Sequence, residues 1–407
     1  MKCGLLGEKL GHSYSPQIHK RLGDYPYDLY EIPRDRLVEF LKTGDFTGLN
    51  VTIPYKKEVI PHLDELSPVA KQLGAVNVIV RRHGRLIGHN TDYFGFATML
   101  RSSGLAVAGK KALVLGSGGA SSVAVAVLRE QGANVVVISR SGENNYGNLH
   151  LHKDAALIVN ATPVGMYPNV SASPIDLGLF PQLEGVLDAI YNPSRTQLLL
   201  DAEARGLIAV NGTLMLVAQA IEASEWFTGS TISGDAISRI HGQLRNQMEN
   251  IILIGMPGSG KSTVGMLLAQ KTGKSFVDAD AEIEKRAGMS IPEIFANQGE
   301  TAFRSLETAV LEDLGKRSGL IIATGGGCVT REENYPHLHR NGRIFCLKRD
   351  LDKLPSSGRP LSQKTPAEEM YRVRKPLYER FADHHIDNNG SAEAAAEEIL
   401  RIWEANA

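Results

Sequence analysis

Gly255-Met256-Pro257-Gly258-Ser259-Gly260-Lys261-Ser262-Thr263 matches G-x-x-x-x-G-K-[ST], the pattern of a phosphate-binding loop. An apolar run at 251–254 precedes the loop, and a stretch of helical character at 264–268 follows it. This order predicts a parallel α/β domain whose loop N–H groups and helix N-terminus bind phosphate. We expect Lys261 at the β- and γ-phosphates and the Ser262 hydroxyl at Mg²⁺, with a chance glycine-rich turn as the alternative. The other candidate nucleotide ligands are Gly258, Ser259, Gly260 and Thr263.

The chain before this loop must form a further unit, because a phosphate loop follows the first strand of its own domain. A length of 407 residues predicts roughly two to three domains, and 43% hydrophobic with 22% charged residues is typical of a globular chain. The net charge of -1 gives no positive electrostatic field that would attract nucleic acid. Without a long apolar run or a signal-like N-terminus, we expect a cytoplasmic protein with no membrane partner. Cys3, Cys328 and Cys346 lack metal-ligand spacing and are expected to be reduced, buried thiols.

Residues 1–100 carry polar clusters where predicted strands end. Ser15 is expected to cap a helix, which leaves Ser13 without an explanation. Two further clusters lie at 50–56 and 88–92, and we expect the second to follow a strand at 76–81. Loops at strand ends are the usual place for site residues.

Residues 101–214 carry a dinucleotide-binding pattern. A strand at 112–115 leads into Gly116–Ser121, which reads as G-x-G-x-x-G with serine in the third glycine position. The next strand, 134–138, is followed by Ser-Arg-Ser, where an NAD site would carry Asp or Glu. Arg140 suits the 2′-phosphate of NADP because a guanidinium pairs with phosphate oxygens. The alternative is a solvated surface arginine.

Six motifs in this order resemble shikimate dehydrogenase, and they cover residues 1–248. They are Ser13-x-Ser15, Asn50-Val51-Thr52-x-Pro54-x-Lys56, Asn90-Thr91-Asp92, the loop at Gly116, Asn160-Ala161-Thr162-Pro163 and Gln219. The resemblance implies a two-lobed α/β dehydrogenase. Its substrate-binding domain would be 1–100, completed by helices of 215–248, and its Rossmann NADP-binding domain would be 101–214.

The same resemblance implies reduction of 3-dehydroshikimate to shikimate by NADPH. Lys56 would be the general acid and Asp92 would orient it, since hydride delivery to a carbonyl creates an alkoxide that needs a proton. The implied substrate-binding residues are Ser13, Ser15, Thr52, Asn77, Asp92, Tyr191 and Gln219, and the implied cofactor-binding residues are Gly116, Gly118, Gly119, Ala120, Arg140, Thr162 and Gly212. For any single hydroxyl or amide, helix capping or a loop hydrogen bond is the alternative.

A helix predicted at 235–247 leads directly to the strand before the phosphate loop, without a Pro/Gly/Ser linker. Residues 249–407 then gather an aspartate pair, a glycine triplet and three arginines. They are Asp278 and Asp280 after a strand at 275–277, Arg304 in a helix at 301–314, Gly325–Gly327 after a strand at 320–323, and Arg359 and Arg374 further on. This set resembles shikimate kinase, a P-loop parallel α/β domain like the nucleoside-monophosphate kinases.

The second resemblance implies ATP-dependent phosphorylation of shikimate to shikimate 3-phosphate. Asp280 would bind the accepting hydroxyl, while Ser262 and Asp278 would serve Mg²⁺. Arg304, Gly326 and Arg374 would bind the substrate, and Lys261 and Arg359 would neutralise the transferring phosphate. Together the two resemblances imply a bifunctional enzyme of the shikimate pathway, which leads to aromatic amino acids. Its partners would be small-molecule substrates, and no oligomeric state is predicted.

Residues 249–407 depart from the shikimate kinase pattern at the expected adenine site. Family members usually carry an arginine several residues before the lid arginine, and it stacks on adenine. Here 352–358 contains no arginine, so either adenine binding is weaker or Lys353 takes that place. The adenine-contacting segment 387–390 also lacks the usual basic residue.

One alternative function is a quinate/shikimate dehydrogenase fused to a nucleotide-sensing P-loop module. Quinate differs little from shikimate, although no acidic residue follows 134–138 to favour NAD. A sensor would need neither Lys56 with Asp92 nor Asp280 with three arginines. The chain also has no Asn-Lys-x-Asp motif of the kind that reads guanine.

Overall fold

The computed structural model describes residues 1–11, 13–354 and 367–405, and the chain divides into two compact units. The first unit comprises 1–192 and 196–241, and the second comprises 193–195 and 242–407. The division falls inside helix α9 (Ala236–Met248), which confirms the helix predicted at 235–247. The finer domain boundaries near residues 100, 214 and 248 stay predictions.

The first unit begins with a six-stranded mixed sheet in the order β2-β1-β3-β5-β6-β4. The strands are β1 (Cys3–Gly7), β2 (Tyr27–Glu31), β3 (Gly48–Val51), β4 (Glu65–Leu66), β5 (Val78–Arg82) and β6 (Arg85–His89). The helices are α1 (Ser15–Leu22), α2 (Leu37–Thr43), α3 (Tyr55–Glu58) and α4 (Pro68–Leu73). Leu6, Leu49, Val51 and Ile79 pack with α2 and α3 in the core of this lobe.

Two sequence predictions for this lobe were wrong. The polar cluster at 88–92 follows β6 and not the strand predicted at 76–81, because β5 turns back at His83 and Gly84. Both turn residues have positive φ, 51° and 78°, as a two-residue hairpin turn requires. Ser15 is the first residue of α1 and its side chain makes no cap bond. Instead, the Ser13 hydroxyl accepts the Ser15 N–H at 3.2 Å, so the cap function has moved two residues upstream.

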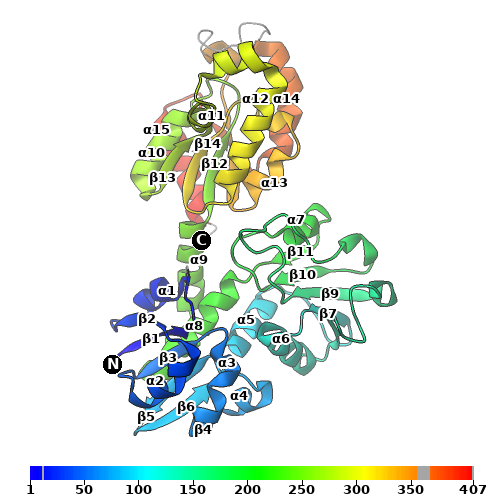
Figure 1. Ribbon diagram of the computed structural model, residues 1–407. Helices are drawn as coiled ribbons and strands as arrows, with labels where there is room; N and C mark the ends of the chain where they lie inside the picture. The colour runs from blue at the N-terminus through cyan, green and yellow to red at the C-terminus, as the bar shows by residue number, and fades with distance from the viewer. Residues whose placement is uncertain (12, 355–366, 406–407) are drawn as a thin grey trace. The chain divides into compact units, whose positions relative to one another are not determined.

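A second, five-stranded parallel sheet completes the first unit in the order β11-β10-β9-β7-β8. The strands are β7 (Lys111–Leu115), β8 (Asn134–Ile138), β9 (Ala155–Asn160), β10 (Gly185–Asp188) and β11 (Ile208–Val210). The helices are α5 (Asp92–Ser102), α6 (Gly119–Glu130), α7 (Gln197–Ala204) and α8 (Thr213–Thr228). Helices α5 and α6 cover one face and α7 the other (Figure 1). The strand order reverses beside β7, which confirms the Rossmann fold and locates its ligand crevice at the carboxyl ends of β7 and β9.

The second unit holds a parallel sheet in the order β13-β14-β12-β15-β16. The strands are β12 (Asn250–Ile254), β13 (Ser275–Asp278), β14 (Leu320–Ala323), β15 (Gly342–Lys348) and β16 (His384–Asp387). The helices are α10 (Lys261–Thr272), α11 (Ala279–Ala287), α12 (Ile291–Gly315), α13 (Asn334–His339), α14 (Ala367–Phe381) and α15 (Ala392–Ala405). Helices α10 and α15 cover one face, and α12, α13 and α14 cover the other (Figure 1). Because β12 is central, the phosphate loop lies in the middle of the carboxyl edge.

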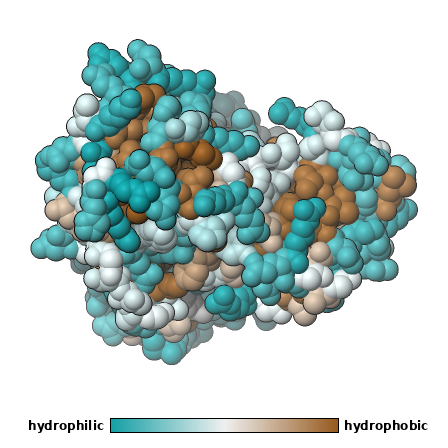
Figure 2. Space-filling view, turned by 90° about the horizontal axis from the view of Figure 1, so that it is seen from below, coloured by the Kyte–Doolittle hydropathy of each residue, from teal (hydrophilic) through white to brown (hydrophobic). Residues whose placement is uncertain are grey.

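The helix predicted at 301–314 forms the second part of α12, which Gly299 interrupts with φ 78°. The strand predicted at 320–323 matches β14. All three cysteines are free and buried, as expected. In the part of the chain that the structure describes, no helix has the length and apolar character needed to cross a membrane. Hydrophilic residues cover most of the face in Figure 2, where apolar residues reach the surface in patches.

Candidate active sites of the two units

Lys56 and Asp92 meet at the carboxyl edge of the mixed sheet. Lys56 lies in α3, which follows β3, and Asp92 is the first residue of α5, which follows β6. Nζ of Lys56 donates to Oδ2 of Asp92 at 2.6 Å, and the two side chains are 26% and 15% exposed. The helix N-terminus favours the Asp92 carboxylate. Thus the fold joins, in one half-buried pair, the two residues that the sequence suggested for proton transfer.

Three amide and hydroxyl groups hold the backbone that carries Asp92. Oδ1 of Asn90 accepts the Asp92 N–H at 3.1 Å. Oδ1 of Asn77 accepts the Thr91 N–H at 2.7 Å, and its Nδ2 donates to the Thr91 hydroxyl at 3.0 Å. The buried Asn77 amide is therefore engaged in supporting this loop, and its contact with substrate stays a prediction.

The other candidate substrate residues lie on four segments of the first unit. Tyr191 packs edge-on against Tyr14, with ring centroids 5.9 Å apart, and so lies beside Ser13 and Ser15. Thr52 follows β3 in the same loop that leads to α3. Gln219 lies on α8 where this helix approaches α5, since a Cβ on Gly95 would lie 3.1 Å from the Gln219 Cβ.

The glycine loop after β7 leaves room for a dinucleotide. Gly116 has φ 105°, and a Cβ there would lie 3.0 Å from the carbonyl oxygen of Ala161 and 3.1 Å from Cγ2 of Thr162. A Cβ on Gly118 or Gly119 would meet nothing within 4 Å. Helix α6 begins at Gly119 without a side-chain cap, and Ala120 follows in its first turn. Open space above an uncapped helix N-terminus fits a pyrophosphate group.

The predicted ligand of the 2′-phosphate lies two residues after β8. Arg140 is exposed just beyond the carboxyl end of β8, where the adenosine ribose of a Rossmann ligand lies. On the other side of β7, Thr162 follows β9, and its hydroxyl donates to Oδ1 of Asn160 at 2.7 Å. Gly212 precedes α8 and admits no side chain, because a Cβ would lie 2.2 Å from the Ala189 carbonyl oxygen.

The buried carboxyl group of Asp188, which is not among the predicted site residues, connects these loops. Asp188 is fully buried at the end of β10. It accepts hydrogen bonds from Nδ2 of Asn160 at 3.0 Å, from the Ile190 N–H at 3.0 Å and from the Thr196 hydroxyl at 2.7 Å. Burial raises the pKa of Asp188 to about 6, although the three hydrogen bonds oppose the shift.

In the second unit, the phosphate loop opens into a cavity of about 500 Å³. Nζ of Lys261 donates to the carbonyl oxygens of Gly255 and Met256 at 2.9 and 3.0 Å. The Ser262 hydroxyl donates to Oδ2 of Asp278 at 2.7 Å. The predicted residues that line this cavity are Gly258, Gly260, Lys261, Ser262, Thr263, Asp278, Asp280, Arg304, Gly326 and Arg374. Ser259 is fully buried and is not among the lining residues, and Arg359 lies outside the described residues.

Each glycine of the triplet after β14 gives space to a different neighbour. A Cβ on Gly325 would lie 2.7 Å from Oδ1 of Asp280, and one on Gly326 would lie 2.6 Å from Cδ of Pro257. A Cβ on Gly327 would lie 2.4 Å from Nη1 of Arg304. The triplet therefore lets a carboxylate, the phosphate loop and a guanidinium converge. Nη1 of Arg374 donates to the Gly326 carbonyl oxygen at 3.0 Å.

Glu307 is a cavity residue that the sequence analysis missed. Nη1 of Arg304 donates to Oε2 of Glu307 at 2.8 Å, and the side chains are 8% and 1% exposed. Burial raises the pKa of Glu307, and the nearby Arg304 opposes this shift. The i, i+3 spacing from Arg304 on a predicted helix was the available signal. Tyr378 was also missed, and its hydroxyl donates to the Gly326 carbonyl oxygen.

The donor set beside the phosphate loop suits a hard cation that also binds phosphate. Among the described residues, no three His, Cys, Asp or Glu side chains come together to hold a metal. Ser262 and Asp278 supply one hydroxyl and one carboxylate. Mg²⁺ in kinase sites is bound by one or two such protein groups together with substrate phosphates, so these residues fit it.

The fold and the two sites define a Rossmann oxidoreductase joined to a phosphate-loop kinase. The family model "Shikimate dehydrogenase substrate binding domain" matches residues 5–79, and the model "Shikimate kinase" matches residues 257–404. The chain belongs to the shikimate dehydrogenase family, and it carries a shikimate kinase domain in the same polypeptide.

Relatives support the dehydrogenase assignment over nearly their whole length. The shikimate dehydrogenase (NADP(+)) of Clostridium perfringens strain SM101 is 37% identical over 265 residues, which cover 60% of this chain and 97% of the relative. The crystal structure of a chorismate mutase/shikimate 5-dehydrogenase fusion protein from Clostridium acetobutylicum aligns with a TM-score of 0.57 and 37% identity, covering 60% of this chain and 96% of that one. The Thermus thermophilus shikimate 5-dehydrogenase in complex with NADP(H) and shikimate aligns with a TM-score of 0.55 and 33% identity, covering 60% and 99%.

Proposed function

We propose that this chain reduces 3-dehydroshikimate to shikimate with NADPH in its first unit and phosphorylates shikimate with ATP and Mg²⁺ in its second. The observation that carries the proposal is the pairing of Lys56 with Asp92 in the same polypeptide as a phosphate-loop cavity that holds Asp280, Arg304 and Arg374. Relatives named shikimate dehydrogenase (NADP(+)) support the first reaction, and the shikimate kinase match supports the second.

In the first reaction, bound NADPH supplies a hydride to the carbonyl carbon of the substrate. The carbonyl π electrons move to oxygen, and Lys56 gives that oxygen a proton from Nζ. Asp92 orients Nζ through the 2.6 Å hydrogen bond and accepts a hydrogen bond from the adjoining substrate hydroxyl. The hydroxyls of Ser13, Ser15 and Tyr191 would hold the substrate carboxylate, and Thr52, Asn77 and Gln219 would hold its ring hydroxyls.

The loop from Gly116 to Ala120 would hold the pyrophosphate of NADPH, and Arg140 would pair with its 2′-phosphate. Thr162 and Gly212 would border the nicotinamide end. The open space at Gly118 and Gly119 and the exposed arginine after β8 support this assignment.

In the second reaction, the shikimate hydroxyl oxygen bonds to the γ-phosphorus, the bond from that phosphorus to the ADP oxygen breaks, and the hydroxyl proton passes to Asp280. Arg304 and Arg374 would grip the substrate carboxylate, and Lys261 would neutralise the transferring phosphate. Bound Mg²⁺ supplies charge that offsets the phosphate oxygens, and Ser262 and Asp278 would hold it. By the resemblance, Arg359 would bring a further positive charge to the transferring phosphate.

A quinate dehydrogenase of Corynebacterium glutamicum in complex with NAD is also similar, with 28% identity and a TM-score of 0.55. Quinate oxidation with NAD is therefore the competing activity for the first unit. The exposed Arg140 favours NADPH over NADH and so supports shikimate chemistry with NADP.

One coupled assay tests both reactions. The chain is given 3-dehydroshikimate, NADPH, ATP and Mg²⁺, and NADPH loss and ADP formation are followed together. We expect NADPH loss without ATP, and ADP formation only after shikimate has formed. ADP formation at the same rate with and without shikimate would show that the second unit only hydrolyses nucleotide. Faster turnover with quinate and NAD would make the first unit a quinate dehydrogenase.

A further inference from the structure

The glycine triplet after β14 carries two backbone donors without an acceptor. The N–H groups of Gly326 and Gly327 form no hydrogen bond with any part of residues 1–11, 13–354 and 367–405. Both residues line the phosphate-loop cavity, and Gly327 is buried. Because backbone N–H groups removed from bulk water almost always find a partner, these two donors are suited to the oxygen atoms of a ligand.

The carbonyl groups of the triplet are held in two different ways. Backbone N–H groups of the turn that follows donate to the carbonyl oxygens of Gly325 and Gly327, at 3.2 and 3.0 Å. The Gly326 carbonyl oxygen instead accepts from two side chains of α14, Nη1 of Arg374 at 3.0 Å and the hydroxyl of Tyr378. The local turn therefore fixes the outer two carbonyl groups, whereas α14 fixes the middle one.

The orientation of the peptide group between Gly326 and Gly327 determines where the second donor points. This peptide group is trans and planar, so its N–H points opposite to its C=O. Since α14 holds the Gly326 carbonyl oxygen, the Gly327 N–H is directed away from that contact. Glycine adopts many backbone conformations, and the peptide group could therefore rotate if the carbonyl were released. A rotated peptide group would present an oxygen atom where the donor now lies.

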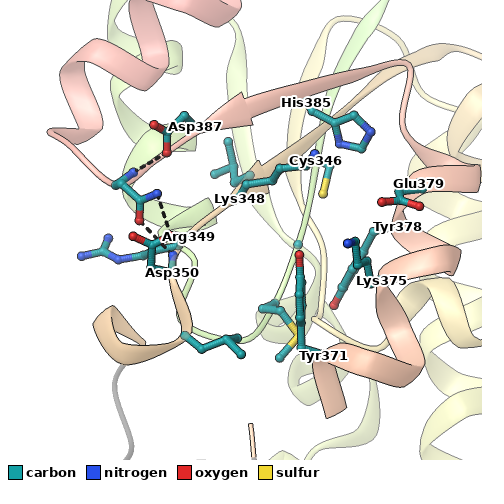
Figure 3. Close-up of a pocket in the computed structure, with 15 residues that line it drawn as sticks. Cys346, Lys348, Arg349, Asp350, Tyr371, Lys375, Tyr378, Glu379, His385 and Asp387 are labelled. Carbon is teal, nitrogen blue, oxygen red and sulfur yellow. Dashed lines mark hydrogen bonds between the residues drawn. The ribbon is translucent and has the colours of Figure 1, made fainter. Parts of the chain in front are cut away.

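Tyr378 is suited to hold this carbonyl group. It is 3% exposed, and burial raises its pKa although the nearby Arg374 opposes the shift, so the hydroxyl keeps its proton and stays a donor. Arg374 lines the phosphate-loop cavity, where we expect it to bind the substrate carboxylate. Tyr378 lines a different cavity, of about 380 Å³, which Figure 3 shows with Tyr371 and Tyr378 on α14. Of the two donors from α14, Tyr378 is thus the one without a second role.

We propose that Tyr378 positions the Gly326–Gly327 peptide group so that the Gly327 N–H faces the phosphate-loop cavity as a donor to the substrate. The inference rests on the proposed kinase function and adds a positioning residue that acts through the backbone. Arg304 lies next to Gly327, since a Cβ there would lie 2.4 Å from its Nη1. A donor beside this guanidinium suits a negatively charged oxygen, whereas a carbonyl oxygen in its place would repel that charge.

The test compares Tyr378→Phe with the control Tyr371→Phe in the full chain, by calorimetry and steady-state kinetics. Tyr371 lies two turns earlier on α14, and its hydroxyl has no hydrogen-bond partner in the part of the chain that the structure describes. We expect Tyr378→Phe to weaken shikimate binding and raise its KM about two- to tenfold, the range for one neutral hydrogen bond. The kcat and the affinity for ATP with Mg²⁺ should stay the same, because the phosphate loop is unchanged. Tyr371→Phe should alter none of these quantities.

Hydrogen exchange at the Gly327 amide reports the orientation of the peptide group. Shikimate should slow this exchange in the wild type and slow it less in Tyr378→Phe. Equal protection in both proteins, together with weaker shikimate binding, would show that Tyr378 acts through Arg374 and would overturn the proposal. A loss of the same size in Tyr371→Phe would assign the effect to the general packing of α14.

The result for the wild type separates this proposal from the kinase function on which it rests. If the wild-type chain binds no shikimate, the proposed kinase function fails and the role of Tyr378 fails with it. If the wild type binds and phosphorylates shikimate and Tyr378→Phe does so equally well, only the role of Tyr378 is overturned.

Discussion

Arg304 and Glu307 form an ion pair of 2.8 Å within one turn of α12, and their side chains are 8% and 1% exposed. Glu300 also approaches Arg304 at 3.2 Å, but its side chain is 55% exposed. The two carboxylates hold the guanidinium against Gly327 and aim it into the cavity. Glu307 should contribute more than Glu300 to holding Arg304, because solvent screens the charge of the exposed Glu300.

Glu307→Gln should raise the KM for shikimate and lower the melting temperature of the second unit. Gln keeps the size of the side chain but leaves the buried guanidinium without its closest counter-charge. Breaking a buried pair costs about 3 to 5 kcal/mol. Steady-state kinetics and calorimetry measure the two effects, with Glu300→Gln as the matched control, for which a change of about 1 kcal/mol or less is expected. Equal effects of the two substitutions would show that burial does not set the strength of the pair.

Lys56→Ala should reduce dehydrogenase turnover by roughly a hundredfold or more, the usual contribution of a positioned acid. The kinase activity should not change, since Lys56 belongs to the other unit. Lys57→Ala is the control, because Lys57 is the adjacent lysine and is exposed. Hydride transfer that survives in Lys56→Ala and falls in Lys57→Ala would exchange the roles of the two lysines.

Arg140→Ala should weaken NADPH much more than NADH, because only NADPH carries the 2′-phosphate. We expect a loss of about 1.5 to 3 kcal/mol for NADPH, the range for hydrogen bonds to a charged group. Fluorescence titration of both cofactors measures the difference. If both cofactors lose affinity equally, Arg140 does not read the phosphate.

Strands β7, β12 and β14 could be predicted because each is a buried apolar run that leads into a glycine loop. The hairpin of β5 and β6 could not, since His83 and Gly84 form a tight turn without the Asn-Gly or Asp-Gly signal of such turns. Motifs pointed to the residues that are expected to contact ligands. Residues that act through another side chain, such as Glu307 on Arg304, carry no motif. The sequence offered only their i, i+3 spacing on a predicted helix, and the structure supplies the contact.

The raised pKa of Asp188 predicts how the stability of the first unit depends on pH. Its pKa is raised to about 6 in the folded chain from an ordinary value of 3.8, so the folded state binds the proton more tightly. The contribution of Asp188 to stability is therefore fully present below about pH 4 and falls as the pH rises through 6, by about 3 kcal/mol at 1.36 kcal/mol per pKa unit. Asp188→Asn keeps the hydrogen-bonding shape and should remove this slope. Unfolding of wild type and variant between about pH 4 and 7 measures it, and parallel curves would contradict the prediction.

Asp280 distinguishes a kinase from a nucleotide switch. The Asp280 carboxylate lines the cavity near Gly325. Its backbone is held by Asp278, whose Oδ1 accepts the Asp280 N–H at 3.0 Å. Asp280→Asn removes the negative charge beside the accepting hydroxyl and keeps the size of the side chain. Turnover on shikimate should therefore collapse. Glu282→Gln is the control, because it removes a charge from the same turn of α11 without touching the cavity.

Nucleotide binding should survive Asp280→Asn, because the loop from Gly258 to Lys261 and the Ser262 hydroxyl remain. Calorimetry should show a change in ATP affinity below about 1 kcal/mol, the scatter expected where no direct contact is lost. Excess shikimate should not restore the rate, since phosphoryl transfer depends on aligning the nucleophile and removing its proton, not on occupancy alone. A variant that phosphorylates shikimate normally would remove Asp280 from the reaction. If the Asp280→Asn variant binds ATP less tightly but keeps its turnover at saturating ATP, Asp280 is a nucleotide ligand, which is the role that a nucleotide switch would give it.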